Sequence, residues 1–145
     1  MIAGDGTYEN ELKILAEGSP NIKFLGRLNF DKLRDLYHKA LAVIVPSICY
    51  EVFGIIIIEA FSMKTPVIVN DLGAMPEVIQ DSGGGFVYGN EHELVEAMEK
   101  LAKEPGLRNK LGENGYQAYV KYWSEDAHLE QYLGLIEQLR NRRKF

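Results

Sequence analysis

The sequence Glu51-Val-Phe-Gly-Ile-Ile-Ile-Ile-Glu59 separates two short apolar runs, at residues 43–45 and 67–69. Both runs are typical of buried parallel strands, which are rich in β-branched residues on both faces. Parallel strands need a crossover connection, which is usually a helix, and residues 54–63 are the only segment between the runs that can supply it. The sequence therefore predicts a strand, a loop, a helix and a second strand, in that order.

The predicted helix contains four consecutive isoleucines, Ile55 to Ile58. On propensity alone they favour a strand, because β-branched side chains are stiff and pack well on a pleated surface. Periodicity does not separate helix from strand in a short apolar run, so the helix rests on connectivity. With isoleucines on every side, we expect this helix to be enclosed by protein rather than half exposed.

The two carboxylates of this stretch are predicted to lie near a ligand. The loop that carries Glu51 is expected at the carboxyl edge of the sheet, where open α/β sheets bind ligands. Glu59 is expected roughly 7 Å along the helix axis from Gly54, at 1.5 Å per residue. The helix start suits an anion, Gly54 permits close backbone approach, and Glu59 can accept hydrogen bonds from two vicinal hydroxyls. Two surface glutamates beside a core helix fit the spacing equally well.

Four groups of residues follow one another along the chain at defined spacings: Pro46-Ser47, Glu51-x-Phe53-Gly54-x4-Glu59-Ala60, Pro66-Val67 and Gly73-x3-Glu77. In this pattern the chain resembles the nucleotide-sugar lobe of glycosyltransferase family 4, whose members have the GT-B fold. The resemblance extends from Ile2-Ala-Gly-Asp-Gly6 to the C-terminal helices. One departure is Ala74, which stands where the family usually has a second glycine after Gly73.

The resemblance implies an α/β fold: a Rossmann-like parallel sheet with helices on both faces, as a partial GT-B C-terminal lobe with a helical C-terminus. It implies one donor-binding domain over residues 1–145 that lacks the first βα units and the whole N-terminal acceptor lobe. The parent enzyme is expected to be a retaining hexosyltransferase that uses a nucleoside diphosphate sugar and an unidentified sugar, lipid or glycan acceptor, without a metal. This chain alone is expected to be inactive.

The resemblance also assigns roles to individual residues. Glu59 is expected to bind the ribose, and Glu51 is expected to be catalytic, orienting the sugar and stabilising positive charge on its ring. The donor sugar and diphosphate are expected at Glu51, Val52, Phe53, Gly54 and Ile55. The base is expected near Arg27, Leu28 and Phe30, with a turn near the nucleotide at Gly4, Asp5 and Gly6. A solvated Arg27 and a plain βα turn at the glycines remain open alternatives.

The composition limits the classes of ligand and partner that this chain is expected to bind. The formal net charge of −5 argues against a nucleic-acid-binding module, and His38, His92 and His128 lack the spacing of metal ligands. The single cysteine, Cys49, excludes an internal disulfide, fits a reducing, cytoplasmic compartment, and is expected to be structural. The C-terminus has a basic end, which is expected to be a solvated tail, with peripheral contact to acidic membrane lipid or to the missing lobe as open alternatives: Arg140, Arg142, Arg143 and Lys144. Apolar surface near Ile2 favours self-association into a homo-oligomer.

The remaining elements follow from turn and capping residues. Helices are expected over residues 8–17, 31–39, 75–80, 91–102, 105–122 and 125–140, and strands over residues 22–25 and 85–88, with Ser124 capping the last helix. Two other functions stay open at this point: a non-catalytic GT-B-like interaction subunit, and another GT-B enzyme such as a sugar-nucleotide epimerase.

Overall fold

The structure is a computed structural model that describes residues 1–142. Arg143 and Lys144, part of the basic C-terminal end, therefore lie outside the described residues. The chain divides into two units, one from Met1 to Leu36 and one that begins at Tyr37. Each unit is described by itself.

The first unit contains α1 (Glu9–Leu15) and most of α2 (Phe30–Lys39). The predicted strand over residues 22–25 is wrong, because Ile2 and Phe24 form only an isolated parallel bridge. Its hydrogen bonds run from the Ile2 amide to the Lys23 carbonyl and from the Leu25 amide to the Ile2 carbonyl, both 2.8 Å. Ile2 is 40% exposed, so little apolar burial is available here to extend the pairing into a ladder.

The second unit is built on a parallel sheet of three strands in the order β1-β2-β3: β1 (Val43–Val45), β2 (Val67–Asn70) and β3 (Gly85–Tyr88). Val67 pairs with Val43 on one side and with Gly85 on the other. The central strand is inaccessible to solvent at Val67, Ile68 and Val69. All three predicted strands of this sheet are confirmed.

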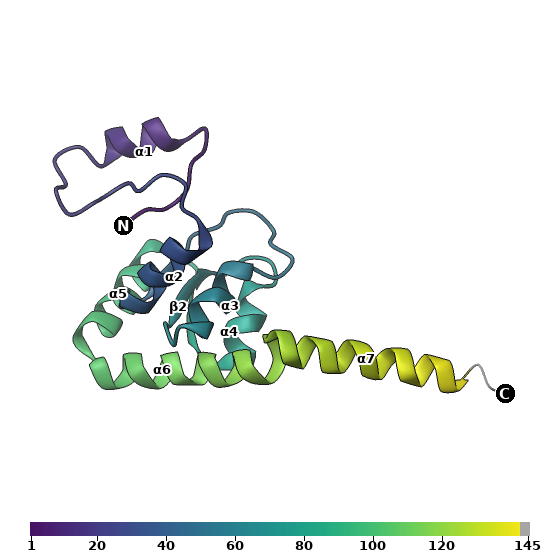
Figure 1. Ribbon diagram of the computed structural model, residues 1–145. Helices are drawn as coiled ribbons and strands as arrows, with labels where there is room; N and C mark the ends of the chain where they lie inside the picture. The colour runs from purple at the N-terminus through teal and green to yellow at the C-terminus, as the bar shows by residue number, and fades with distance from the viewer. Residues whose placement is uncertain (143–145) are drawn as a thin grey trace. The chain divides into compact units, whose positions relative to one another are not determined.

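Helices cover both faces of this sheet (Figure 1). Val67 and Val69 point to one face, where they pack with α3 (Ile55–Ser62) and α4 (Met75–Ser82). Ile68 points to the other face and packs against Ala97 and Leu101 of α5 (Glu91–Lys103). This alternation follows from the two-residue period of a strand. Because Val67, Ile68 and Val69 are all apolar, both faces of β2 are apolar.

The crossover segment between β1 and β2 is helical, as connectivity predicted. The expectation that protein would enclose it is wrong, because Ile55 is 65% exposed and Ile56 45%. Ile57, Ala60 and Phe61 are fully buried. A spacing of three and four residues puts these side chains on one face of α3, so only that face packs on the sheet and the first turn stays open.

The C-terminal part of the second unit consists of α6 (Pro105–Ala118), a π-helical turn η1 (Tyr119–Trp123) and α7 (Glu125–Arg142). A single helix over residues 105–122 was expected. The prediction is wrong for residues 119–122, because the α-helix ends at Ala118 and a π-helical turn follows. The Trp123 ring stacks on Phe61 with 6.2 Å between centroids, and the widened turn accommodates this contact. Ser124 caps α7 as expected, its hydroxyl accepting from the Ala127 amide at 3.3 Å.

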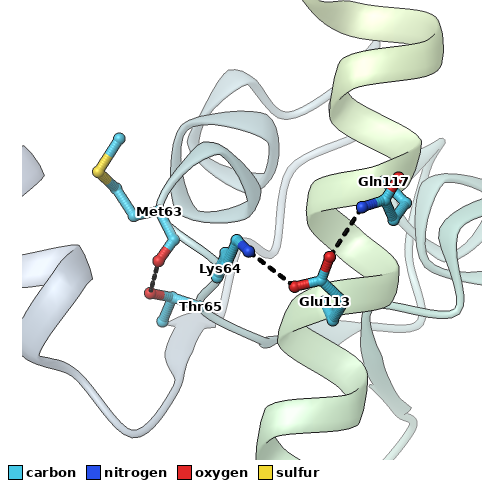
Figure 2. A network of polar contacts seen from close by, with 5 residues as sticks. All are labelled: Met63, Lys64, Thr65, Glu113 and Gln117. Atoms are coloured by element: carbon cyan, nitrogen blue, oxygen red, sulfur yellow. Dashed lines mark hydrogen bonds and ion pairs between the residues drawn. The ribbon is translucent and has the colours of Figure 1, made fainter.

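Helix α6 crosses the amino-terminal edge of the sheet, where a polar network holds it to the turn before β2 (Figure 2). Lys64, in the left-handed conformation with φ of 58°, pairs with Glu113 at 2.8 Å. Gln117 donates to the same carboxylate at 2.7 Å. The hydrogen bond between Lys64 and Glu113 raises the pKa of Lys64 and lowers the pKa of Glu113. Both side chains are about half exposed, so water weakens the pair.

Close packing at this edge leads to a stability prediction for two glycines of α6. A Cβ on Gly112 would lie 2.1 Å from the Lys64 carbonyl oxygen, whereas a Cβ on Gly106 would have nothing within 4 Å. We expect Gly112→Ala to destabilise the chain by about 1–3 kcal/mol, because the backbone must shift. Gly106→Ala should be neutral or stabilising by up to about 1 kcal/mol. Urea unfolding measures both, and equal stability of the two variants would contradict the packing described here.

Candidate functional site

The loop that carries Glu51 begins at the carboxyl edge of the sheet. Ser47 follows the end of β1, and Asn70 is the last residue of β2. The Asn70 side-chain amide donates to the Ser47 carbonyl at 3.0 Å. This hydrogen bond joins the two strand ends and fixes the start of the loop that carries Glu51.

Glu51 is held by its side chain and by its backbone. The Ser47 hydroxyl donates to Glu51 Oε1 at 3.1 Å, and the Ala74 amide donates to the Glu51 carbonyl at 3.2 Å. Gly73 has a left-handed φ of 66°, and a Cβ there would lie 2.9 Å from the Glu51 carbonyl oxygen. Only glycine adopts this conformation at such a distance without strain. The loops after β1 and β2 therefore pack backbone to backbone. Glu51 is half-buried where they meet.

Gly54 begins helix α3 in a conformation that favours glycine. Its φ is 82° and its ψ is 70°. A Cβ here would lie 3.0 Å from Ile57 Cδ1 and 3.4 Å from Met75 Cγ. The first-turn N–H groups of a helix lack partners within it and form the positive end of its dipole. No acidic side chain occupies this first turn, so the helix start is electrostatically suited to an anion.

Glu59 lies one turn further along α3, and sequence analysis missed its partner. The Tyr37 hydroxyl donates to Glu59 Oε2 at 3.1 Å. Tyr37 is only 8% exposed, and the Thr65 hydroxyl donates to its carbonyl at 2.7 Å. Burial, and then the Glu59 carboxylate, raise the pKa of Tyr37 to about 12. The two side chains are 22 positions apart, so no local motif marks them as a pair.

The other predicted site residues differ in where they lie. Val52 is 93% exposed, whereas the Phe53 ring turns toward the core and meets Trp123 at 6.0 Å between centroids. Cys49 is exposed, so the expectation of a structural cysteine is wrong; it belongs to the open loop before Glu51. The residues predicted near the base and the nucleotide turn all belong to the first unit, and their roles stay predictions: Gly4, Asp5, Gly6, Arg27, Leu28 and Phe30.

In residues 1–142, no three or more His, Cys, Asp or Glu side chains are grouped so that they can hold a metal ion. Within the same range, no helix combines the length and the apolar character that crossing a membrane requires.

The amino-acid sequence matches the family model described as Glycosyl transferases group 1 over residues 1–118. The chain belongs to this family. An uncharacterized glycosyltransferase of Methanocaldococcus jannaschii is 33% identical over 134 residues, covering 88% of this chain and 34% of that protein. A GDP-mannose-dependent monoacylated alpha-(1-6)-phosphatidylinositol monomannoside mannosyltransferase of Corynebacterium glutamicum is 29% identical over 145 residues, covering 94% of this chain and 38% of that protein.

A solved structure of sucrose-phosphate synthase from Thermosynechococcus elongatus matches this group 1 chain with a TM-score of 0.81 and 25% identity, covering 94% of this chain and 35% of that one. The predicted fold class is thereby confirmed: a parallel sheet with helices on both faces, as in the C-terminal domains of GT-B glycosyltransferases. The chain spans about a third of the length of these relatives.

The buried phenol of Tyr37 leads to a prediction about stability and pH. Its pKa is raised from 10.0 to about 12, so between these values the folded chain holds a proton that the unfolded chain releases. The free energy of unfolding therefore falls as the pH rises from 10 to 12, and the contribution is fully present below pH 10. We expect this fall to be smaller in Tyr37→Phe.

Urea unfolding of both proteins below pH 10 and near pH 12 checks this difference. Tyr50→Phe is the control, because Tyr50 is 83% exposed and its removal should leave the fall unchanged. Parallel pH profiles for the wild type and Tyr37→Phe would show that the phenol is not coupled to folding.

Proposed function

We propose that this chain is the nucleotide-sugar-binding part of a retaining glycosyltransferase, which transfers a hexose from a nucleoside diphosphate sugar to an acceptor hydroxyl. The observation that carries the proposal is the arrangement along α3 in a group 1 chain. A helix start without acidic residues, at Gly54, is followed five positions later by the carboxylate of Glu59. Family membership and the GDP-mannose dependence in the name of the Corynebacterium relative support this type of donor.

The diphosphate is proposed to bind at the start of α3. Free N–H groups at Gly54 and Ile55 would donate to phosphate oxygens, and the helix dipole favours their negative charge. During transfer the bond between the anomeric carbon and the diphosphate oxygen breaks, and the diphosphate keeps the electron pair. The acceptor oxygen bonds to the anomeric carbon, and its proton passes to the departing diphosphate. Donors already aimed at the departing anion stabilise this charge without reorganisation.

The ribose is proposed to bind at Glu59. An ionised carboxylate has two oxygens and about four acceptor positions. Tyr37 donates to Oε2, so acceptor positions remain for two vicinal ribose hydroxyls. The roughly 7 Å of helix axis from Gly54 to Glu59, at 1.5 Å per residue, matches the span from a diphosphate to the far side of a ribose.

The donor sugar is proposed to bind at Glu51 and at the adjacent backbone of Val52 and Phe53. Ser47 donates to Glu51 Oε1, which orients the carboxylate and leaves Oε2 for sugar hydroxyls. A carboxylate in this place also stabilises the positive charge that develops on the sugar ring as the anomeric bond breaks. We propose this electrostatic role for Glu51, rather than that of a nucleophile in a double displacement. Retention, independence of metals and placement of the base near Arg27, Leu28 and Phe30 rest on resemblance.

Substitution of the two glutamates should change ligand affinity in different ways. We expect Glu59→Ala to weaken both a free nucleoside diphosphate and its nucleotide sugar, because both carry the ribose. A hydrogen bond to a charged group contributes on the order of 1.5–3 kcal/mol, or about ten- to a hundredfold in affinity. Glu51→Ala should weaken only the nucleotide sugar. Calorimetric titration of the wild type with UDP, GDP and ADP, and with their glucose or mannose conjugates, first identifies the preferred base. Titration of the two variants with that nucleoside diphosphate and its nucleotide sugar then gives four affinities to compare with the wild type.

Glu96→Ala is the matched control, because Glu96 lies on α5, which packs on the opposite face of the sheet from α3. Glu96→Ala should bind both ligands with the affinity of the wild type. Equal losses from Glu51→Ala and Glu59→Ala with both ligands would contradict the division of roles. Unchanged affinities throughout, or no binding by the wild type, would contradict the site itself.

A further inference from the structure

We propose that Tyr37 is a positioning residue for the ribose site: its hydroxyl orients the Glu59 carboxylate so that the carboxylate discriminates ribose from deoxyribose. This inference rests on the proposed function, because it assumes that Glu59 binds the ribose. It adds Tyr37, from α2, to a ribose site for which the sequence pattern names only Glu59.

The geometry around Tyr37 is fixed at both ends of the residue. Its carbonyl accepts from the buried Thr65 hydroxyl at 2.7 Å, and Thr65 lies in the turn between α3 and β2. Its side-chain hydroxyl donates to Glu59 at 3.1 Å. Tyr37 as a whole is 8% exposed, so its side chain has little freedom to leave Glu59. A flexible carboxylate on α3 is thereby tied to a rigid, buried partner.

The chemistry of the pair explains why a tyrosine suits this position. A phenol is neutral up to high pH and donates one hydrogen bond, so it orients the carboxylate without neutralising it. Lysine or arginine would form an ion pair that competes with ligand hydroxyls for the same oxygens. Because Oε2 is engaged by Tyr37, the plane of the carboxylate is set before the ligand arrives. Ordering the side chain in advance removes an entropic cost of binding.

The pair should therefore matter most for a ligand that has both ribose hydroxyls. A carboxylate already held in one plane accepts from two vicinal hydroxyls without losing further rotational freedom, whereas a freely rotating one must give up that freedom to accept from both. We expect Tyr37→Phe to weaken a ribonucleoside diphosphate about three- to tenfold. Its 2′-deoxy counterpart should be affected less, so that the ratio of the two affinities falls. Loss of packing alone would lower both affinities together.

The experiment is a double-mutant cycle with two ligands. Calorimetry gives the affinities of the ribonucleoside diphosphate that binds tightest among UDP, GDP and ADP, and of its 2′-deoxy form. The proteins are the wild type, Tyr37→Phe, Glu59→Ala and the double variant. We expect Tyr37→Phe to lower the ribose-to-deoxyribose ratio in the wild type and to change nothing further in the Glu59→Ala background. Tyr119→Phe is the control, because Tyr119 lies in η1 and packs on Tyr116.

The outcomes separate this inference from the proposed function. Loss of discrimination in Glu59→Ala, with an unchanged ratio in Tyr37→Phe, would overturn the inference and leave the function standing. Independent, additive losses in the double variant would also overturn it. No effect of Glu59→Ala on either ligand, or no binding by the wild type, would overturn the function and the inference together. If circular dichroism shows that Tyr37→Phe is unfolded, Thr65→Val takes its place with the same expected loss, and an unchanged ratio there overturns the inference.

Discussion

The close packing of four elements around the Phe61 ring is the constraint on which the second unit depends. Phe61 is fully buried on α3, and a Cβ on Gly84 or Gly115 would lie only 2.5 Å or 2.4 Å from its ring. Trp123 stacks on the same ring. The crossover helix, the start of β3, α6 and the π-helical turn therefore all meet at one side chain. Because α3 is fixed in this way, the position of every residue along it is fixed relative to the edge of the sheet.

A common feature of the two proposed site carboxylates is that each accepts from a neutral hydroxyl: Glu51 from Ser47, and Glu59 from Tyr37. Neutral donors orient a carboxylate but leave its charge unbalanced. Where the chain uses an ion pair instead, as between Lys64 and Glu113, the pair holds α6 at the opposite, amino-terminal edge of the sheet. Charge compensation is thus used for packing at the amino-terminal edge, while the carboxylates of Glu51 and Glu59 keep the negative charge and acceptor positions that the proposed ligand hydroxyls need.

Much of this architecture could be predicted from the sequence, because connectivity restricts what a segment between two parallel strands can be. Strands β1 and β2 and the helical crossover follow from that argument, whereas β3 was predicted from the turn residues before it. The exposed first turn at Ile55 and Ile56 did not, because a uniformly apolar run carries no information about which face is buried. The π-helical end of α6 depends on packing against Phe61, and the partner of Glu59 is 22 positions away. Both are tertiary contacts without a local pattern.

The two carboxylates also differ in how they are supported, and this difference fits the proposed roles. Glu59 is on a helix anchored through Ile57, Ala60 and Phe61, so its position changes only if the core changes. Glu51 is in a loop fixed by a few hydrogen bonds and by the close approach of Gly73. The ribose is common to UDP-, GDP- and ADP-sugars, whereas the transferred sugar varies among them. A rigid element for the constant part and an adjustable loop for the variable part would allow donor preference to change while the core packing around α3 is retained.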